Sequence, residues 1–356
     1  MAGGRGERFW PQSRLKRPKH LLPIVGDKPM LAQTIERLDG LVPPERILVI
    51  TNVEQRAAVR EVCPQLPAAN VIGEPVGRDT AAAVGLAVTL VKARNPQAVV
   101  AMLPADAAIH DHDGFRRALS AAFAAARQEP VIVTLGIPPT FPATGYGYIE
   151  NGEVWQSFDG IEARRVTRFV EKPDRATAEG YLAAGNFTWN AGMFIFAASA
   201  VDDAFARHTP ALHAALSTIG AEIVSGDLDT VLAAHYPSLE KISVDYAIME
   251  PASAEGKIVT LPAVFDWDDV GEWSAIARHL PGDGAGNTVR GNGVVEGGTG
   301  NIVVTEPGHT VALLGVDDLI VVQTADATLV CPKSRAQDIK ALVKKLTGEL
   351  GRTDLA

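Results

Sequence analysis

The sequence is poor in the features that mark several large classes of protein. Its 356 residues include two cysteines, Cys63 and Cys331, and neither belongs to a paired-cysteine motif, so the pattern implies neither a disulfide framework nor a zinc site. No stretch reaches the run of about eighteen apolar residues that a membrane-spanning helix needs. The first twenty residues are rich in arginine and lysine and lack the apolar core of a secretory signal. We therefore expect a protein of the cytoplasm.

Positive charge is also in deficit. Lysine and arginine number 33 against 42 aspartates and glutamates, for a net charge of −9. A chain with this balance has no broad electrostatic attraction for nucleic acid or for an anionic membrane. We therefore expect small-molecule partners, and any anionic ligand must be held by a local cluster of cations. Hydrophobic residues at 47% and charged residues at 21% indicate an ordinary globular protein.

Short runs of valine, isoleucine and leucine alternate with stretches of helical spacing. The runs predict strands at 46–51, 98–103 and 131–136, and the spacing predicts helices at 79–94 and 113–127. This alternation is typical of an α/β protein whose parallel sheet is covered on both faces. Such sheets bind ligands at the carboxyl ends of their strands. Motifs that directly follow strands are therefore the best candidates for a functional site.

Beyond about residue 280 the pattern changes. A turn-rich break at 281–287 is followed by the short apolar runs NIVV, TVALL, LIVVQ and TLVC, which are separated by turn residues. Apolar residues from Ile339 to Leu350 then follow the spacing of an amphipathic helix. We predict two domains, an α/β domain over 1–280 and a β-rich appendage with a final helix over 281–356.

The opening residues carry a glycine cluster. Gly3, Gly4 and Gly6 let the backbone approach a ligand closely, and their amides can surround phosphate oxygens. Arg8 and Lys19 add positive charge on either side of the cluster. The cluster lacks the third glycine of GxGxxG and the GK[ST] of a Walker A loop. Taken alone, it is equally well interpreted as a plain turn.

Two aspartates have positions that suit a divalent cation. Asp106 follows the predicted strand at 98–103, and Asp269 precedes Gly271, which permits a turn. Carboxylates from two distant segments, completed by substrate phosphates, suit the oxygen preference of Mg²⁺. A helix cap is the alternative for Asp106. We interpret Asp268, next to Asp269, as a solvated neighbour.

The whole opening string, AGGRGERFWPQSRLKRPKH, resembles the GGxGxRxxPxSxxxPK signature of the sugar nucleotidyltransferases. Trp10 and the PKH ending resemble the variant found in mannose-1-phosphate guanylyltransferases. Further family-like strings occur in the family's order: GEPVGRDTAAA (73–83), LPAD (103–106), TGYGYI (144–149), FVEKP (169–173), WNAGMFIF (189–196), VDYAIME (244–250) and FDWDDVGEW (265–273). The resemblance spans nearly the full chain. It implies a Rossmann-like, mixed and mostly parallel sheet, with a small appendage like a left-handed β-helix through which relatives pair as homodimers.

The resemblance also implies roles for individual residues. It assigns Mg²⁺ to Asp106 and Asp269. It implies that Arg8 and Lys19 balance charge on the leaving pyrophosphate, and that Lys172 holds the sugar phosphate. Without the resemblance, Lys172 beside a glutamate in a loop is better interpreted as a solvated ion pair.

Binding residues follow in the same way. We assign nucleotide binding to Gly3, Gly4, Gly6, Glu74, Arg78 and Thr80. We assign binding of the sugar phosphate to Gly145, Tyr146, Glu171 and Asn190. The Glu74 carboxylate can accept two hydrogen bonds side by side, which matches the donor edge of guanine. Arg78 and Thr80 are equally compatible with a simple helix start. A glycine-rich turn is the alternative for Gly145 and its neighbours.

These expectations combine into one reaction, in which GTP and α-D-mannose 1-phosphate give GDP-mannose and pyrophosphate. Another hexose or heptose 1-phosphate as substrate, and a non-catalytic regulatory protein that binds a sugar nucleotide, are the alternatives. A dinucleotide-dependent dehydrogenase lacks its fingerprint here. In the family a strand precedes the glycine loop, so we expect the functional form to extend upstream of Met1 by about six apolar residues.

Overall fold

The computed structural model describes all 356 residues and contains a six-stranded mixed sheet. Its strand order is β3-β7-β4-β8-β6-β5, and the strands are β3 (Val99–Met102), β4 (Ile132–Ile137), β5 (Tyr148–Phe158), β6 (Ile161–Val170), β7 (Phe187–Ala197) and β8 (Ile258–Pro262). Strand β4 is parallel to β8, whereas β7 is antiparallel to β3 and β4. Strand β6 is antiparallel to both β8 and β5. Four strands therefore run in one direction and two in the other, which confirms the mixed α/β sheet.

A separate parallel pair, β1 (Val49–Asn52) and β2 (Val71–Glu74), lies beside this sheet. Met1 and Ala2 lie between β1 and Leu103, the residue that follows β3. The Ala2 amide donates to the Ile50 carbonyl at 2.8 Å, and the amino group of Met1 donates to the Leu103 carbonyl at 2.7 Å. No strand joins β1 to β3. The upstream strand stays a prediction.

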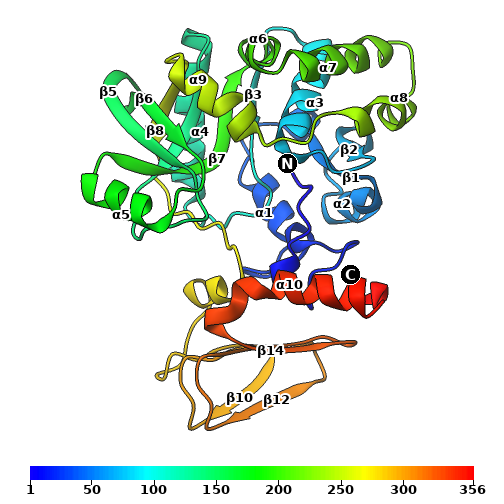
Figure 1. Cartoon of the computed structure of the whole chain (residues 1–356), viewed down its shortest axis with the longest axis vertical. Helices are drawn as coiled ribbons and strands as arrows, with labels where there is room; N and C mark the ends of the chain where they lie inside the picture. Colours follow the sequence, from blue (N-terminus) through cyan, green and yellow to red (C-terminus); the bar gives the residue numbers. More distant parts are fainter.

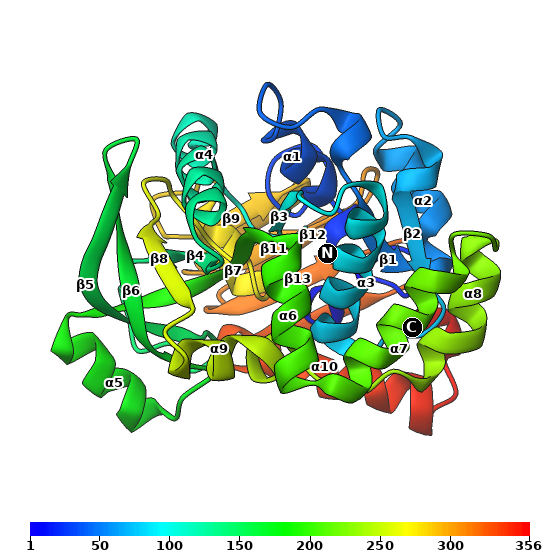
Figure 2. The same ribbon diagram turned by 90° about the horizontal axis from the view of Figure 1, so that it is seen from above.

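Helices cover both faces of the large sheet (Figures 1 and 2). On one face lie α3 (Asp79–Arg94), α6 (Ala198–His208) and α7 (Pro210–Glu222), and on the other lies α4 (His112–Gln128). Phe194 and Phe196 of β7 join the cluster on the α3 side, and Ile195 between them joins the cluster on the α4 side. The alternation has the period of two that a strand imposes, and burial of both faces explains the continuous apolar runs.

Local chemistry explains where several helices begin and end. Asp111 caps α4 by accepting a hydrogen bond from the Gly114 amide at 2.9 Å, and Asp174 caps α5 (Arg175–Ala184) through the Thr177 amide at 2.8 Å. Gly185 closes α5 at a left-handed φ of +73°. The other α-helices that precede the C-terminal part are α1 (Met30–Glu36), α2 (Arg56–Val62), α8 (Leu228–His235) and α9 (Glu250–Ala254). No helix combines the length and apolar character needed to cross a membrane.

The C-terminal part is β-rich. Its strands are β9 (Thr288–Arg290), β10 (Asn292–Glu296), β11 (Ile302–Val304), β12 (Thr310–Leu314), β13 (Leu319–Gln323) and β14 (Thr328–Pro332). Strands β9, β11 and β13 are parallel neighbours, and β10 and β12 form a second parallel pair. Successive strands from β9 to β13 alternate between these two small parallel sheets, which agrees with the expected β-helix-like appendage.

The final helix lies between the β-rich domain and the rest of the molecule (Figure 1). Helix α10 (Ile339–Lys344) continues into a π-helical turn over Lys345–Glu349. Ile339 and Val343 share one buried cluster with Phe9 and Trp10. The predicted final helix is therefore present, and it packs directly on the glycine loop.

Candidate active site

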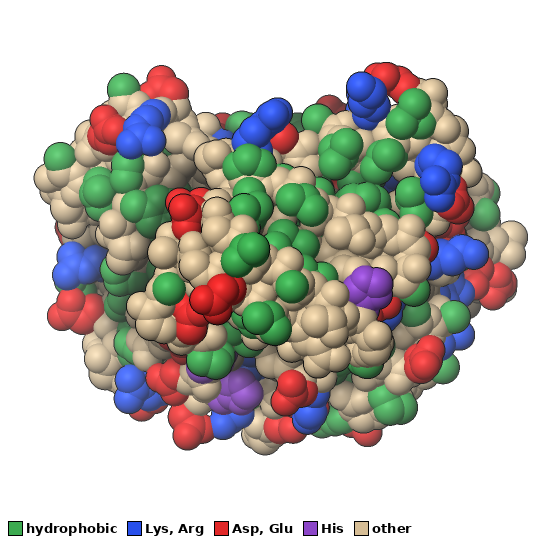
Figure 3. Space-filling model, turned by 90° about the horizontal axis from the view of Figure 1, so that it is seen from below, with side chains coloured by type: hydrophobic (Ala, Val, Ile, Leu, Met, Phe, Trp, Pro, Cys, Tyr) green, Lys and Arg blue, Asp and Glu red, His purple; other side chains and the backbone are tan.

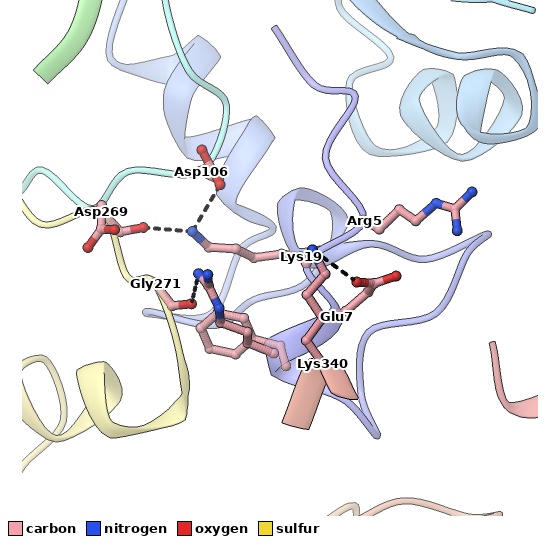
Figure 4. Close-up of a pocket in the computed structure, with 10 residues that line it drawn as sticks. Arg5, Glu7, Lys19, Asp106, Asp269, Gly271 and Lys340 are labelled. Atoms are coloured by element: carbon pink, nitrogen blue, oxygen red, sulfur yellow. Dashed lines mark hydrogen bonds and ion pairs between the residues drawn. The ribbon is translucent and has the colours of Figure 1, made fainter. Parts of the chain in front are cut away.

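A cavity of about 570 Å³ opens beside the glycine loop (Figure 4). Its lining is highly charged and consists of Arg5, Gly6, Glu7, Arg8, Phe9, Lys19, Asp106, Asp269, Gly271 and Lys340. Four of these side chains are cations, three are carboxylates and one is apolar. A cavity of this composition suits an anionic ligand together with a cation, and it does not suit an apolar ligand.

Gly6 is the glycine that the loop requires. Its φ is +64°, and a Cβ at this position would lie 2.3 Å from the Cβ of Lys19. The Ser13 hydroxyl donates to the Gly6 carbonyl at 2.8 Å and fixes the turn. Because the loop folds back this tightly, the segment that carries Lys19 passes directly beneath it.

Lys19 connects the two predicted metal ligands. Its Nζ donates to Oδ2 of Asp106 at 3.0 Å and to the backbone carbonyl of Asp269 at 2.7 Å, and Lys19 is only 6% exposed (Figure 4). Burial acts to raise the pKa of Asp106, but the adjacent ammonium outweighs it and lowers that pKa. The two carboxylates therefore line one cavity although more than 160 residues separate them in sequence.

Asp268 has a structural environment that the sequence did not suggest. Its side chain is 12% exposed and accepts hydrogen bonds from Arg278 Nη2 at 2.8 Å and from His279 Nε2 at 3.0 Å. It also accepts from the amide of buried Val270, which has a left-handed φ of +46°. Our interpretation of Asp268 as a solvated neighbour is wrong, because ion pairing holds it inside the turn that carries Asp269.

Tyr146 lies between the cavity and a second group of predicted residues. Its hydroxyl donates to Oδ1 of Asp269 at 2.6 Å. Its ring packs edge-on against Trp189, with centroids 5.1 Å apart, and against Trp267 at 5.6 Å. Burial and the Asp269 carboxylate raise the pKa of the phenol, so it remains a hydrogen-bond donor. Sequence reasoning placed Tyr146 on the sugar phosphate and missed its bond to Asp269.

Gly147, Glu171 and Asn190 form the second cluster. A Cβ on Gly147 would lie 2.7 Å from Oε2 of Glu171 and 3.4 Å from the Cβ of Asn190. Lys172 Nζ forms an ion pair with Glu171 Oε1. Gly145, by contrast, is exposed with open space around it. The structure thus brings Glu171, Asn190 and Lys172 together beside Gly147, whereas a Cβ on Gly145 would meet nothing within 4 Å.

Asp245 is a neighbour of this cluster to which the sequence assigned no role. It begins the π-helical turn Asp245–Met249. Burial and the nearby Glu171 carboxylate raise the pKa of Asp245 to about 7, and Lys172 opposes that rise. The VDYAIME string was the signal that could have drawn attention to it.

The predicted nucleotide residues divide into two sets. Glu74, at the end of β2, is 6% exposed, accepts a hydrogen bond from the Tyr236 hydroxyl and faces Gly3. Burial raises the pKa of Glu74. Arg78 instead donates to the Pro237 carbonyl, and the Thr80 hydroxyl accepts from the Val244 amide at 2.8 Å. Of the six residues predicted to bind the nucleotide, only Gly6 lines the main cavity.

Family comparison agrees with this geometry. The nucleotidyl transferase family matches residues 1–283, and the MannoseP isomerase/GMP-like beta-helix domain matches residues 292–346. The chain therefore belongs to the nucleotidyl transferase family, an enzyme family, as its motifs predicted.

Individual proteins of this family are similar to the chain over nearly its whole length. Mannose-1-phosphate guanylyltransferase of Escherichia coli is 40% identical over 349 residues, which cover 97% of this chain and 73% of the relative. The alginate biosynthesis protein AlgA of Pseudomonas aeruginosa is 37% identical over 99% of this chain and 72% of its own length. Among solved structures, a Thermus thermophilus protein described as a mannose-1-phosphate geranyltransferase matches with a TM-score of 0.85 and 38% identity over 97% of both chains. The expected fold is confirmed.

Proposed function

We propose that this protein transfers a guanylyl group from GTP to α-D-mannose 1-phosphate, giving GDP-mannose and pyrophosphate. The observation that carries the proposal is the contact of Lys19 with both Asp106 and Asp269 in one cavity beside the glycine loop. The names of the relatives support mannose 1-phosphate as the acceptor.

The reaction is a single displacement. An ionised phosphate oxygen of the sugar phosphate forms a bond to the α-phosphorus of GTP, while the bond from that phosphorus to the bridging oxygen breaks. Pyrophosphate leaves with the electron pair, so no covalent protein intermediate is needed. Because both reactants are anions, the protein must hold them in line and balance their charge.

The cations of the main cavity and of the second cluster contact different reactants. Arg8 and Lys19, in the cavity wall, balance the negative charge that develops on the departing pyrophosphate. The exposed Lys172 ammonium binds the sugar phosphate. Glu171 accepts hydrogen bonds from sugar hydroxyls, and the amide nitrogen of Asn190 can donate to another, because only its oxygen is bonded in the structure, to Thr134 and to the Gly192 amide.

Asp106 and Asp269 fit Mg²⁺. Both side chains offer carboxylate oxygens, the ligands that Mg²⁺ prefers, at the wall of one cavity. Tyr146 bonds Oδ1 of Asp269, which leaves Oδ2 for an ion. When bound, Mg²⁺ would neutralise phosphate charge near the α-phosphorus. The protein side chains would supply two ligands, and phosphates and water the rest.

Glu74 is our candidate for base selection. Tyr236 engages Oε1, but each carboxylate oxygen can accept two hydrogen bonds, so both remain available to the N1 and N2 donors of guanine. Replacing Glu74 with Gln should reduce the preference for GTP over ATP, UTP and dTTP by about tenfold or more. An unchanged preference would remove Glu74 from the base site.

The decisive assay measures pyrophosphate release over a panel of sugar phosphates and nucleotides, with the product identified by mass. We expect the highest kcat/KM for GTP with mannose 1-phosphate. A higher kcat/KM for another hexose or heptose 1-phosphate would show that this other sugar phosphate is the preferred acceptor. Nucleotide binding without pyrophosphate release from any pair would favour the regulatory alternative.

We also propose a cytoplasmic homodimer. Both cysteines are free thiols, which suits a reducing compartment. On the β-rich domain, Val294 and Leu314 are 55% and 79% exposed, and hydrophobic side chains lie scattered among polar ones on this face (Figure 3). A second copy would cover them. Light scattering should give twice the mass of one chain, and Leu314→Asp should shift it toward the monomer; a monomeric parent protein would remove the proposal.

A further inference from the structure

Lys340 is the only residue of the C-terminal domain that lines the main cavity. It lies in the first turn of α10, and its Nζ is 4.0 Å from Oε2 of Glu7 in the glycine loop. Figure 4 shows it rising from the helix beside Glu7 and toward the segment of Lys19. Two domains therefore supply cations to one cavity.

The backbone of Lys340 is held firmly against the loop. Ile339, next to it, and Val343, one turn later, are buried in one cluster with Phe9. The end of the chain also contacts this segment, because the Trp10 indole donates a hydrogen bond to the Leu355 carbonyl at 3.0 Å. The Lys340 side chain itself is 69% exposed, so its ammonium is open to a ligand in the cavity. A lysine with a packed backbone and an exposed ammonium suits contact with a phosphate.

Lys340 determines the net charge of the cavity lining. Without it, Arg5, Arg8 and Lys19 would face the three carboxylates Glu7, Asp106 and Asp269, and the lining would be neutral overall. Glu7 would then repel a polyphosphate from the same wall. Lys340 offsets the charge of Glu7 at 4.0 Å, too far for a hydrogen bond, so its three N–H donors remain available to phosphate oxygens.

We propose that Lys340 is a phosphate-binding residue of the transferase, contacting the β- and γ-phosphates of the bound nucleotide and then the departing pyrophosphate. The inference rests on the proposed function for the identity of the nucleotide reaction. It makes the β-rich domain part of the active site.

Pyrophosphate itself is the probe, because it tests the contact without any choice of base or sugar. Calorimetric titration with pyrophosphate and Mg²⁺ should show Lys340→Ala weakening binding about threefold to tenfold, the range of a partly exposed charged hydrogen bond. Lys340→Arg should keep most of the affinity. Lys344→Ala removes the same charge from an exposed site on the same helix outside the cavity, and it should change the Kd by less than about twofold.

The double variant Glu7→Gln/Lys340→Ala separates direct contact from neutralisation of Glu7. We expect it to bind more weakly than Glu7→Gln alone. Equal affinity of those two proteins, equal effects of the two lysine variants, or failure of the parent protein to bind pyrophosphate would each overturn the proposal. If the parent protein binds pyrophosphate through Lys340 but makes no GDP-mannose, only the proposed function fails.

Discussion

The hydroxyl of Tyr146 donates a hydrogen bond of 2.6 Å to Oδ1 of Asp269. This bond joins the aromatic residues next to the second cluster to the main cavity. Tyr146→Phe keeps the ring and its contacts with Trp189 but leaves Oδ1 without its donor. Because groups that orient metal ligands affect metal affinity, we expect Mn²⁺ or Mg²⁺ binding to weaken about tenfold or more.

Calorimetry or electron paramagnetic resonance of Mn²⁺ measures this change independently of turnover. Tyr148→Phe is a suitable control, because the Tyr148 hydroxyl has no hydrogen-bond partner in the structure. A Tyr146→Phe protein that binds Mn²⁺ as tightly as its parent would show that the bond has no part in a metal site.

Asp268 should matter for the shape of the Asp269 turn. Asp268→Asn loses the ion pair with Arg278, disturbs the hydrogen bond with His279 and weakens the support of strained Val270. We expect a loss of about 1–3 kcal/mol in the free energy of unfolding, together with a lower kcat. Urea titration measures the first effect. Asp39→Asn, at an exposed position, should change neither, and an equal effect of both variants would contradict the assignment.

Asp245 should give the protein a pH-dependent stability. Its folded-state pKa of about 7 lies above its ordinary value of 3.8, so between these values the folded chain keeps a proton that the unfolded chain has released. The stabilisation from this proton is fully present below about pH 4 and is lost as the pH rises through about 7. Asp245→Asn should therefore stabilise the protein at about pH 8 by about 1–3 kcal/mol and have little effect at about pH 4.5. A difference independent of pH would contradict the shift.

Gly6→Ala should be strongly disruptive. The added Cβ would meet Lys19 at 2.3 Å on a backbone with φ +64°. Moving Lys19 would also disturb its contacts with Asp106 and Asp269. We expect a loss of about 2–4 kcal/mol in unfolding free energy and nearly complete loss of turnover. Gly77→Ala, where nothing lies within 4 Å of the new atom, is the matched control for thermal melting.

Part of the site could be predicted from the sequence because its residues follow recognisable strings. The convergence of Gly147, Glu171 and Asn190, and of Asp106 with Asp269, agrees with the motifs. The partners of Tyr146 and Asp268, the position of Asp245 and the reach of Lys340 could not be predicted in this way. Each depends on contacts between separate segments, and no local pattern encodes such a contact.

Residue order alone accounts for the alternation of strands and helices, the burial of both sheet faces and the glycine cluster at the start of the chain, because hydrophobic period and backbone sterics act over a few residues. Only the folded chain shows that the Lys19 ammonium reaches the carbonyl of Asp269, 250 residues away, and that α10 lies against the glycine loop. Such distant contacts depend on how whole elements pack, and that packing is settled by the summed burial of the shared core around Phe9 and Ile339.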